Sequence, residues 1–191
     1  MKHDICNVVL ALFLPVMPIA PALAQGWVQP PTDGRETHLL NVGSGLCLVP
    51  EYEARINGLA IVQQPCIQTD LWHRWEFLVL PGFQYGQDHP GIYLVNNAPH
   101  LLGGPQCLDD RDGKTADWSP VQQWPCNFTS TTMQWKLVAL GDQDSVIQFI
   151  NMRSGKCLDV RGGSLAPGAA LQIYRCTSTV TSPNWAQLFR W

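Results

Sequence analysis

The stretch Asn151-Met152-Arg153-Ser154-Gly155-Lys156-Cys157-Leu158-Asp159-Val160 decides the fold, because its last part occurs three times in the chain. Cys47-Leu48-Val49 and Cys107-Leu108-Asp109 repeat Cys157-Leu158-Asp159, and residues 41–48 are a weaker copy of the longer stretch. In each copy a second cysteine follows 19 positions after the first, at Cys66, Cys126 and Cys176. Equal spacings of this kind indicate three internal repeats.

The segments around the second cysteine repeat as well. Residues 61–65, 121–125 and 171–175 precede it with similar patterns. An aromatic residue follows, with an apolar or aromatic residue two places later: Trp75 with Phe77 and Trp135 with Leu137. In the third repeat, spacing alone selects Trp185, whereas the residue pattern selects Phe189 with four inserted residues. We prefer Phe189, because a surface loop accommodates an insertion at little entropic cost.

Short apolar runs between Gly and Pro residues predict short strands and an all-β fold, a sandwich or barrel. One repeat cannot bury its apolar face alone, so the three repeats are expected to share a core with threefold pseudo-symmetry. Each repeat is expected to hold an internal disulfide worth about 3 kcal/mol. The predicted core consists of Leu48, Leu108, Leu158, Trp75, Trp135 and Phe189.

The first residues have the features of an export signal. Lys2 precedes an apolar run with three prolines, and Ala22-Leu23-Ala24 fits a cleavage site. We therefore expect a signal peptide at 1–24, an extended arm at 25–36 and one domain at 37–191. Loss of Cys6 with the signal leaves six cysteines, an even number that implies disulfides in an oxidising compartment. The chain is expected to be secreted, or periplasmic or at the cell surface in a bacterium.

The charge of the chain excludes some partners. The formal net charge is −3 and no basic stripe is present, so nucleic acid is not expected as a partner. No membrane span is expected in the mature chain. Eight tryptophans exceed what a core of this size needs, which indicates exposed rings available for stacking.

The repeated motifs resemble the ricin B-type lectin family, whose members are β-trefoils with a Q-x-W motif in each repeat. The resemblance covers about residues 39–191. It implies a β-trefoil fold and carbohydrate binding, with glycans as partners and no cofactor. It also implies a subsite built from an Asp after the first cysteine, a Gln and an aromatic before the second, and an Asn-Gln pair from the Q-x-W motif.

The three repeats carry this subsite to different degrees. The third offers Asp159, Gln172, Tyr174 and Gln187, with Ala186 in place of the asparagine and Asn184 nearby. The second offers Asp109, Gln122 and Trp124, with Thr132 and Met133 in place of the amide pair. The first has Val49, Val62 and Gln64 at these positions and is expected to be inactive.

The chemistry of these side chains fits sugars. A carboxylate accepts hydrogen bonds from two vicinal hydroxyls, an aromatic ring covers the C–H face of a pyranose, and amides fix the orientation. We expect up to two shallow sites, for galactose-like sugars. The alternative role for Asp109 and Asp159 is to hold a turn through their own side chains.

Other functions remain open at this stage. The chain also resembles the cell-binding subunits of cytolethal distending toxin, which makes a toxin or other protein partner, bound through the arm, the alternative function. A trefoil protease inhibitor ranks last. An enzyme is not expected, since no nucleophile motif is present and the acids Asp109 and Asp110 are adjacent on a strand. The four histidines of the mature chain show no metal spacing and are expected in solvated loops: His38, His73, His89 and His100.

Overall fold

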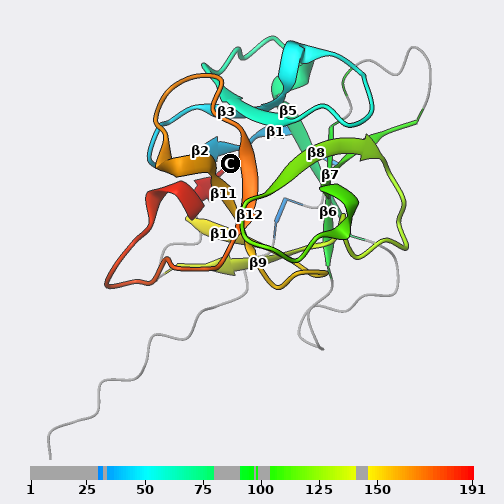
Figure 1. The fold of residues 1–191 in the computed structure, drawn as a ribbon. Coiled ribbons are helices and arrows are strands. Elements are labelled where there is room, and N and C mark those ends of the chain that lie inside the picture. Colours follow the sequence, from blue (N-terminus) through cyan, green and yellow to red (C-terminus); the bar gives the residue numbers. More distant parts are fainter. Residues whose placement is uncertain (1–29, 32–33, 80–90, 97, 99–103, 141–145) are drawn as a thin grey trace, which may run out of the picture.

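The computed structural model describes residues 30–31, 34–79, 91–96, 98, 104–140 and 146–191 (Figure 1). The predicted signal peptide at 1–24 and most of the predicted arm at 25–36 lie outside the described residues, as do His89 and His100. Within the described part, no helix is long and apolar enough to cross a membrane.

The described chain consists of short strands joined by turns, and its helices are single 3₁₀ turns, as the Gly- and Pro-rich sequence predicted. The strands are β1 (Thr37–His38), β2 (Leu40–Asn41), β3 (Cys47–Pro50), β4 (Ile61–Gln64), β5 (Arg74–Val79), β6 (Ile92–Asn96), β7 (Gln106–Asp110), β8 (Ser119–Pro125), β9 (Trp135–Ala139), β10 (Ile147–Asn151), β11 (Cys157–Val160), β12 (Leu171–Tyr174) and β13 (Phe189–Arg190). The 3₁₀ turns are η1 (Glu51–Glu53), η2 (Leu71–His73), η3 (Arg111–Gly113), η4 (Arg161–Gly163) and η5 (Trp185–Gln187).

One set of strands closes into a barrel. The antiparallel pairings run from β2 to β13, then β10, β9, β6 and β5, and from β5 to β1. Only Leu39 separates β1 from β2, so the circuit returns to its start. Closure leaves these strands without a free edge, which removes the usual site for unwanted strand pairing.

The remaining strands form three hairpins in the same register. Cys47 pairs with Gln64 in β3–β4, Cys107 with Trp124 in β7–β8, and Cys157 with Tyr174 in β11–β12. Each hairpin touches the other two: β12 pairs with β8, and isolated bridges join residues 60 to 122 and 62 to 170. A closed barrel with three mutually contacting hairpins is a β-trefoil, so the predicted fold class is confirmed.

The core confirms the predicted repeat alignment. Leu48, Leu108, Leu158, Trp75, Trp135 and Phe189 are all fully buried and belong to one cluster. Trp185, the alternative to Phe189, is 53% exposed, so the four-residue insertion is confirmed. The indole Nε1 of Trp75 donates to the Leu48 carbonyl at 2.8 Å, and that of Trp135 to the Leu108 carbonyl at 3.0 Å.

The three predicted disulfides are confirmed. They join Cys47 to Cys66, Cys107 to Cys126 and Cys157 to Cys176, each with a sequence separation of 19. Each bond links the start of a hairpin to the chain that follows its second strand. The covalent link therefore closes the base of the hairpin that carries the candidate site residues.

Candidate functional site

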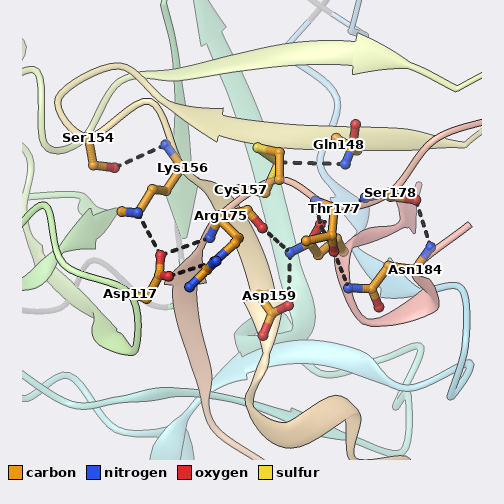
Figure 2. Close-up of a disulfide and its surroundings, with 12 residues drawn as sticks. Asp117, Gln148, Ser154, Lys156, Cys157, Asp159, Arg175, Thr177, Ser178 and Asn184 are labelled. Atoms are coloured by element: carbon orange, nitrogen blue, oxygen red, sulfur yellow. Dashed lines mark hydrogen bonds and ion pairs between the residues drawn. A yellow bond between two sulfur atoms is a disulfide. The ribbon is translucent and has the colours of Figure 1, made fainter.

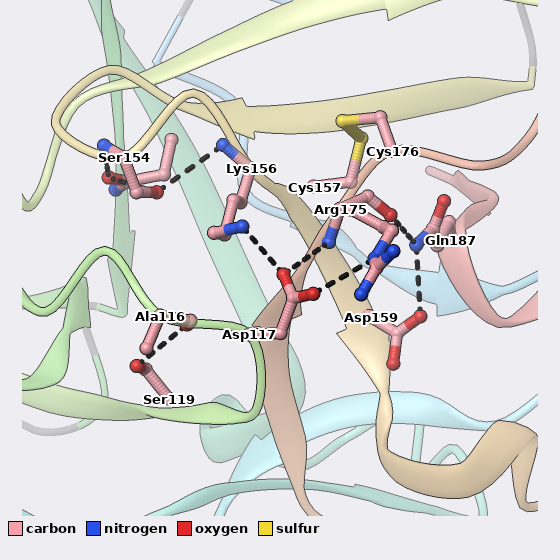
Figure 3. A network of polar contacts seen from close by, with 11 residues as sticks. Ala116, Asp117, Ser119, Ser154, Lys156, Cys157, Asp159, Arg175, Cys176 and Gln187 are labelled. Carbon is pink, nitrogen blue, oxygen red and sulfur yellow. Dashed lines mark hydrogen bonds and ion pairs between the residues drawn. A yellow bond between two sulfur atoms is a disulfide. The ribbon is translucent and has the colours of Figure 1, made fainter.

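The third repeat brings the predicted residues together around one carboxylate. Asp159 on β11 lies directly opposite Gln172 on β12, and it is 5% exposed. Its Oδ1 accepts a hydrogen bond from Gln172 Nε2 at 2.8 Å. Its Oδ2 accepts one from Gln187 Nε2 at 3.1 Å (Figure 3). Each carboxylate oxygen keeps a further lone pair, so Asp159 can accept two more hydrogen bonds from a ligand.

The orientation of the glutamine is fixed by an arginine behind it. Arg161 Nε donates to Gln172 Oε1 at 3.2 Å, so the amide presents its Nε2 to Asp159. The second repeat has the same arrangement, because Arg111 Nε donates to Gln122 Oε1 at 2.9 Å. Burial raises the pKa of Asp159, while the hydrogen bonds from Gln172 and Gln187 lower it. The two amides thus stabilise the charged form that accepts hydroxyl donors.

A shallow depression of about 170 Å³ lies beside this carboxylate. Tyr174, on the same hairpin, is half-buried and forms one wall. Asn184 forms another wall, and its Nδ2 donates to Thr177 Oγ1 at 2.8 Å (Figure 2). Ala186 stands at the sequence position of the expected asparagine, and Asn184 lines the same depression. The full lining is Trp118, Asp159, Gly162, Gly163, Tyr174, Asn184 and Ala186.

The second repeat is built on the same plan with one substitution. Asp109 on β7 accepts a hydrogen bond from Gln122 Nε2 at 2.8 Å and one from the Thr132 hydroxyl at 2.6 Å. Thr132 thus supplies the second donor that Gln187 supplies in the third repeat. Trp124 is 42% exposed, and these residues line a cleft of about 820 Å³. Burial raises the pKa of Asp109, as it does for Asp159.

The turn-holding alternative for the two aspartates is not supported by their contacts. In the described residues, the hydrogen bonds of both carboxylates go to side chains across the hairpin or from the following loop. The 3₁₀ turns that follow, η3 and η4, begin without a side-chain cap. The carboxylates therefore do not cap η3 or η4, although they do accept hydrogen bonds from Thr132 and from Gln187 of η5.

The side chain at the glutamine position of the Q-x-W motif also has a structural role, which is the same in all three repeats. The residue after the second cysteine donates its backbone N–H to this side chain: Thr177 to Gln187 Oε1 at 2.9 Å, Asn127 to Met133 Sδ at 3.3 Å, and Ile67 to His73 Nδ1 at 3.3 Å. Of these three side chains, Gln187 is the one that also donates to the aspartate of the candidate site, from its Nε2 to Asp159 Oδ2.

The first repeat lacks the polar pair. Val49 lies opposite Val62 in the register that Asp159 and Gln172 occupy in the third repeat, and both valines are buried in a small apolar cluster. Gln64 stands at the position of Tyr174. No carboxylate occupies this place, which agrees with the expectation that the first subsite is inactive.

Two histidines correct one expectation. The histidines were expected in solvated loops, but His38 is half-buried in strand β1. His73 is fully buried, and its Nε2 lies 3.2 Å from Glu53 Oε1. Ligand atoms of Glu53, Asp70 and His73 lie within 4.8 Å of one another. Because Nδ1 accepts the Ile67 N–H, the neutral ring carries its proton on Nε2 and has no free lone pair for a metal. This group therefore does not fit a metal site.

Trp118 is the site residue that the sequence interpretation missed. It was left as a loop tryptophan without a role, yet its ring centroid lies 4.5 Å from that of Tyr174 and it lines the depression beside Asp159. The signal in the sequence was its place 11 positions after Cys107, where the other repeats have Gly58 and Gly168.

Comparisons with known proteins place the chain in a family. Residues 72–174 match the model of the ricin-type beta-trefoil lectin domain-like family, which is more than half of the chain, and the protein belongs to that family. A search of curated proteins found no match.

Solved structures share the fold. A designed 3-fold symmetric protein, ThreeFoil, has 23% identity and a TM-score of 0.65, with 81% of this chain and 96% of that chain covered. A ricin B-like lectin from Macrolepiota procera in complex with lactose has 15% identity and a TM-score of 0.58, with coverage of 82% and 94%. An exo-beta-1,3-galactanase from Clostridium thermocellum has 22% identity and a TM-score of 0.66, with 84% of this chain but 30% of that chain covered.

Proposed function

We propose that the protein is a secreted, non-enzymatic lectin that binds galactose-like sugars through the third-repeat site, with a second site in the second repeat. The observation that carries this proposal is the Asp159 carboxylate, held by Gln172 and Gln187 beside the face of Tyr174. This arrangement offers acceptors for vicinal hydroxyls and an apolar face for the C–H side of the ring.

The preference for galactose-like sugars draws on the similar proteins. The Macrolepiota procera structure holds lactose, which contains a galactose residue, and the Clostridium thermocellum protein is a galactanase. Because both proteins are less than 25% identical to this chain, we use them only to choose the first ligands to test.

Binding without catalysis fits the third-repeat site. Glycoside hydrolysis commonly uses two carboxyl groups on opposite sides of the scissile bond. In the described lining of the depression, Asp159 is the one carboxylate, and its oxygens are engaged by amides. A shallow site of this type binds weakly, and two sites on one molecule would gain strength from multivalent ligands.

The test is a multivalent glycan array probed with the oxidised mature chain. The wild-type protein is expected to bind a subset of galactose-containing glycans, and an Asp109→Asn and Asp159→Asn double variant is expected to lose the signal. Tyr174→Ala should weaken binding, whereas Gln64→Ala, at the equivalent position of the first repeat, is the matched control and should not. Absence of any signal from the wild-type chain at high multivalency would refute the proposal.

Secretion is the second part of the proposal. Three disulfides in a chain of this size fit an oxidising compartment, and residues 1–24 have the pattern of a cleaved signal. Expression of the full chain in a secreting host should release a protein whose N-terminus, read by mass spectrometry, lies near Gln25. An intracellular product that retains Met1 would contradict this part.

A partner-binding subunit of a secreted toxin complex is the second candidate function. Its supporting observation is the first repeat, which lacks a polar site and instead exposes four large apolar residues: Tyr52 (80%), Ile56 (58%), Ile67 (48%) and Leu71 (40%). Under this alternative, a toxin-like protein would co-purify stoichiometrically, and deletion of residues 25–35 or a Tyr52→Ser and Ile67→Ser double variant would release it.

A further inference from the structure

A tryptophan occupies a backbone position that the other repeats fill with glycine. Trp118, Gly58 and Gly168 each stand 11 positions after the first cysteine of their repeat, and their φ angles are 73°, 85° and 81°. Glycine adopts this left-handed conformation freely, whereas a bulky side chain is strained there. An unfavourable residue at such a place is a reason to look for a function.

The three positions are equivalent in space, because each donates its backbone N–H to the next hairpin. Gly58 donates to the Gln123 carbonyl at 3.0 Å, Trp118 to the Ile173 carbonyl at 3.0 Å, and Gly168 to the Gln63 carbonyl at 2.8 Å. The position therefore flanks the candidate site of the following repeat, not its own.

The residue at this position determines whether a side chain lies beside the aromatic ring of the following repeat's candidate site, Trp124 or Tyr174. A Cβ added to Gly58 would lie 3.7 Å from the Trp124 ring, so the glycine leaves that ring without a neighbour from this turn. In the third-repeat site, the ring centroids of Trp118 and Tyr174 are 4.5 Å apart with a tilt of 48°, so the two rings are in contact, and Trp118 remains 57% exposed. The Arg175 guanidinium also lies over the Tyr174 ring, 5.3 Å from its centroid.

A salt-bridge clamp holds the turn that carries Trp118. Asp117 Oδ1 lies 2.6 Å from Lys156 Nζ and accepts the Arg175 backbone N–H at 3.0 Å, while Asp117 Oδ2 accepts a bond from Arg175 Nε at 2.9 Å (Figure 3). The bond from Lys156 is the main cause of a lowered pKa of Asp117, so the clamp stays charged in mildly acidic solution.

The other two junctions lack this clamp. Asn57 and Pro167 stand at the position of Asp117, and Pro65 and Pro125 stand at the position of Arg175. The clamp and the tryptophan thus occur together at one junction, beside the site with the complete Asp, Gln, aromatic and Gln set.

From this geometry we propose that Trp118 and Tyr174 form a two-ring platform that binds two adjacent sugar residues, so that the third-repeat site recognises an oligosaccharide chain rather than a single sugar. The inference rests on the proposed lectin function. Because the rings are tilted by 48°, one flat pyranose cannot stack on both. A sugar bound by Asp159 covers Tyr174, and its linked neighbour covers the exposed face of Trp118.

The experiment compares matched mono- and disaccharides on multivalent arrays, with galactose and lactose as one pair and the corresponding N-acetylgalactosamine, glucose and mannose pairs beside it. The protein carries Asp109→Asn, so the third-repeat site is measured alone. This protein is expected to bind its preferred disaccharide more tightly than the matching monosaccharide. Trp118→Gly should weaken the apparent affinity for the disaccharide roughly twofold to tenfold, as expected for one lost ring contact. The apparent affinity for the monosaccharide should stay within about twofold of the unchanged value.

Further results separate the two-ring platform from the proposed lectin function. Trp118→Gly should fold with an unchanged or higher Tm, since glycine suits the backbone there, and Trp118→Phe should recover part of the disaccharide binding. Equal loss for both sugars, or no loss for either, would overturn the two-residue platform while leaving the lectin function standing. Failure of the unmutated chain to bind any glycan, or full binding by the Asp109→Asn and Asp159→Asn double variant, would instead overturn the proposed function.

Discussion

The paired residues Asp159 and Gln172 allow a quantitative test of how the site is built into the hairpin. Replacing Asp159 with Val leaves Gln172 Nε2, in a fully buried side chain, without its acceptor. Replacing Gln172 with Val removes one of the two side-chain donors to the buried Asp159 carboxylate. Each single change is expected to lower the free energy of unfolding by about 1–3 kcal/mol, the usual cost of a buried polar group that loses its partner.

The double change should cost less than the sum. The first repeat shows that the same register accepts Val49 opposite Val62 in a buried apolar cluster. Gln187 Nε2 keeps its bond to the Arg175 carbonyl at 2.9 Å, so it is not orphaned. A double-mutant cycle is therefore expected to give a coupling energy of about 2 kcal/mol, so that the double variant loses about 2 kcal/mol less stability than the two single changes added together.

Urea unfolding of the oxidised variants, followed by tryptophan fluorescence, measures the cycle. The reciprocal exchange in the first repeat is the control: Val49→Asp alone should destabilise strongly, and added Val62→Gln should restore part of the loss. In a chain that also carries Asp109→Asn, which removes the second-repeat site, all variants that lack Asp159 should fail to bind on the glycan array. If the losses from Asp159→Val and Gln172→Val simply add, the two side chains do not act as a pair and the reasoning is refuted.

Three further predictions concern stability. Burial, followed by the charges of Asp109 and Asp112, raises the pKa of Asp110 to about 7, so the folded protein binds a proton between about pH 4 and pH 7 that the unfolded chain releases. Stability from this group is present at low pH and is lost as pH rises through 7. Asp110→Asn should therefore reduce the dependence of Tm on pH over this range. It should raise the free energy of unfolding by on the order of 1–2 kcal/mol at pH 8, a figure reduced for screening in the cleft. Trp135→Phe should cost about 1–2 kcal/mol in urea unfolding, because the buried Leu108 carbonyl loses its indole donor. Replacing Cys157 and Cys176 together by Ala should cost about 3 kcal/mol, and a melt unchanged from the wild type would show that this bridge does not stabilise the fold.

The fold could be predicted from the sequence because its determinants are local and recur three times. Each repeat carries its own cysteine pair, a buried leucine and an aromatic residue, so the alignment of three copies reveals the shared core. The insertion before Phe189 was identified for the same reason, since the core needs a large apolar residue there while Trp185 lies in a surface turn.

The site was predicted less completely because it combines residues from neighbouring repeats and loops. Thr132 donates to Asp109 from the loop after the second disulfide, and its hydroxyl does not resemble the expected amide pair. Trp118 belongs to the second repeat but flanks the third-repeat site, a relation that no pattern within one repeat contains. Comparison of Trp118 with Gly58 and Gly168 would have shown that the position is unusual.

The Q-x-W position shows why the binding residues vary more between repeats than the core does. In all three repeats the side chain at this position accepts the backbone N–H of the residue after the second cysteine, and the acceptor atom comes from Gln187, Met133 or His73. The proposed sugar site has a further requirement: the side chain at this position must also donate a hydrogen bond to the aspartate of the site, as Gln187 does to Asp159. Met has no such donor, and His73 directs its Nε2 to Glu53 instead. A change at this position can therefore keep the loop in place while it removes the sugar site, which separates the stability of a repeat from its function.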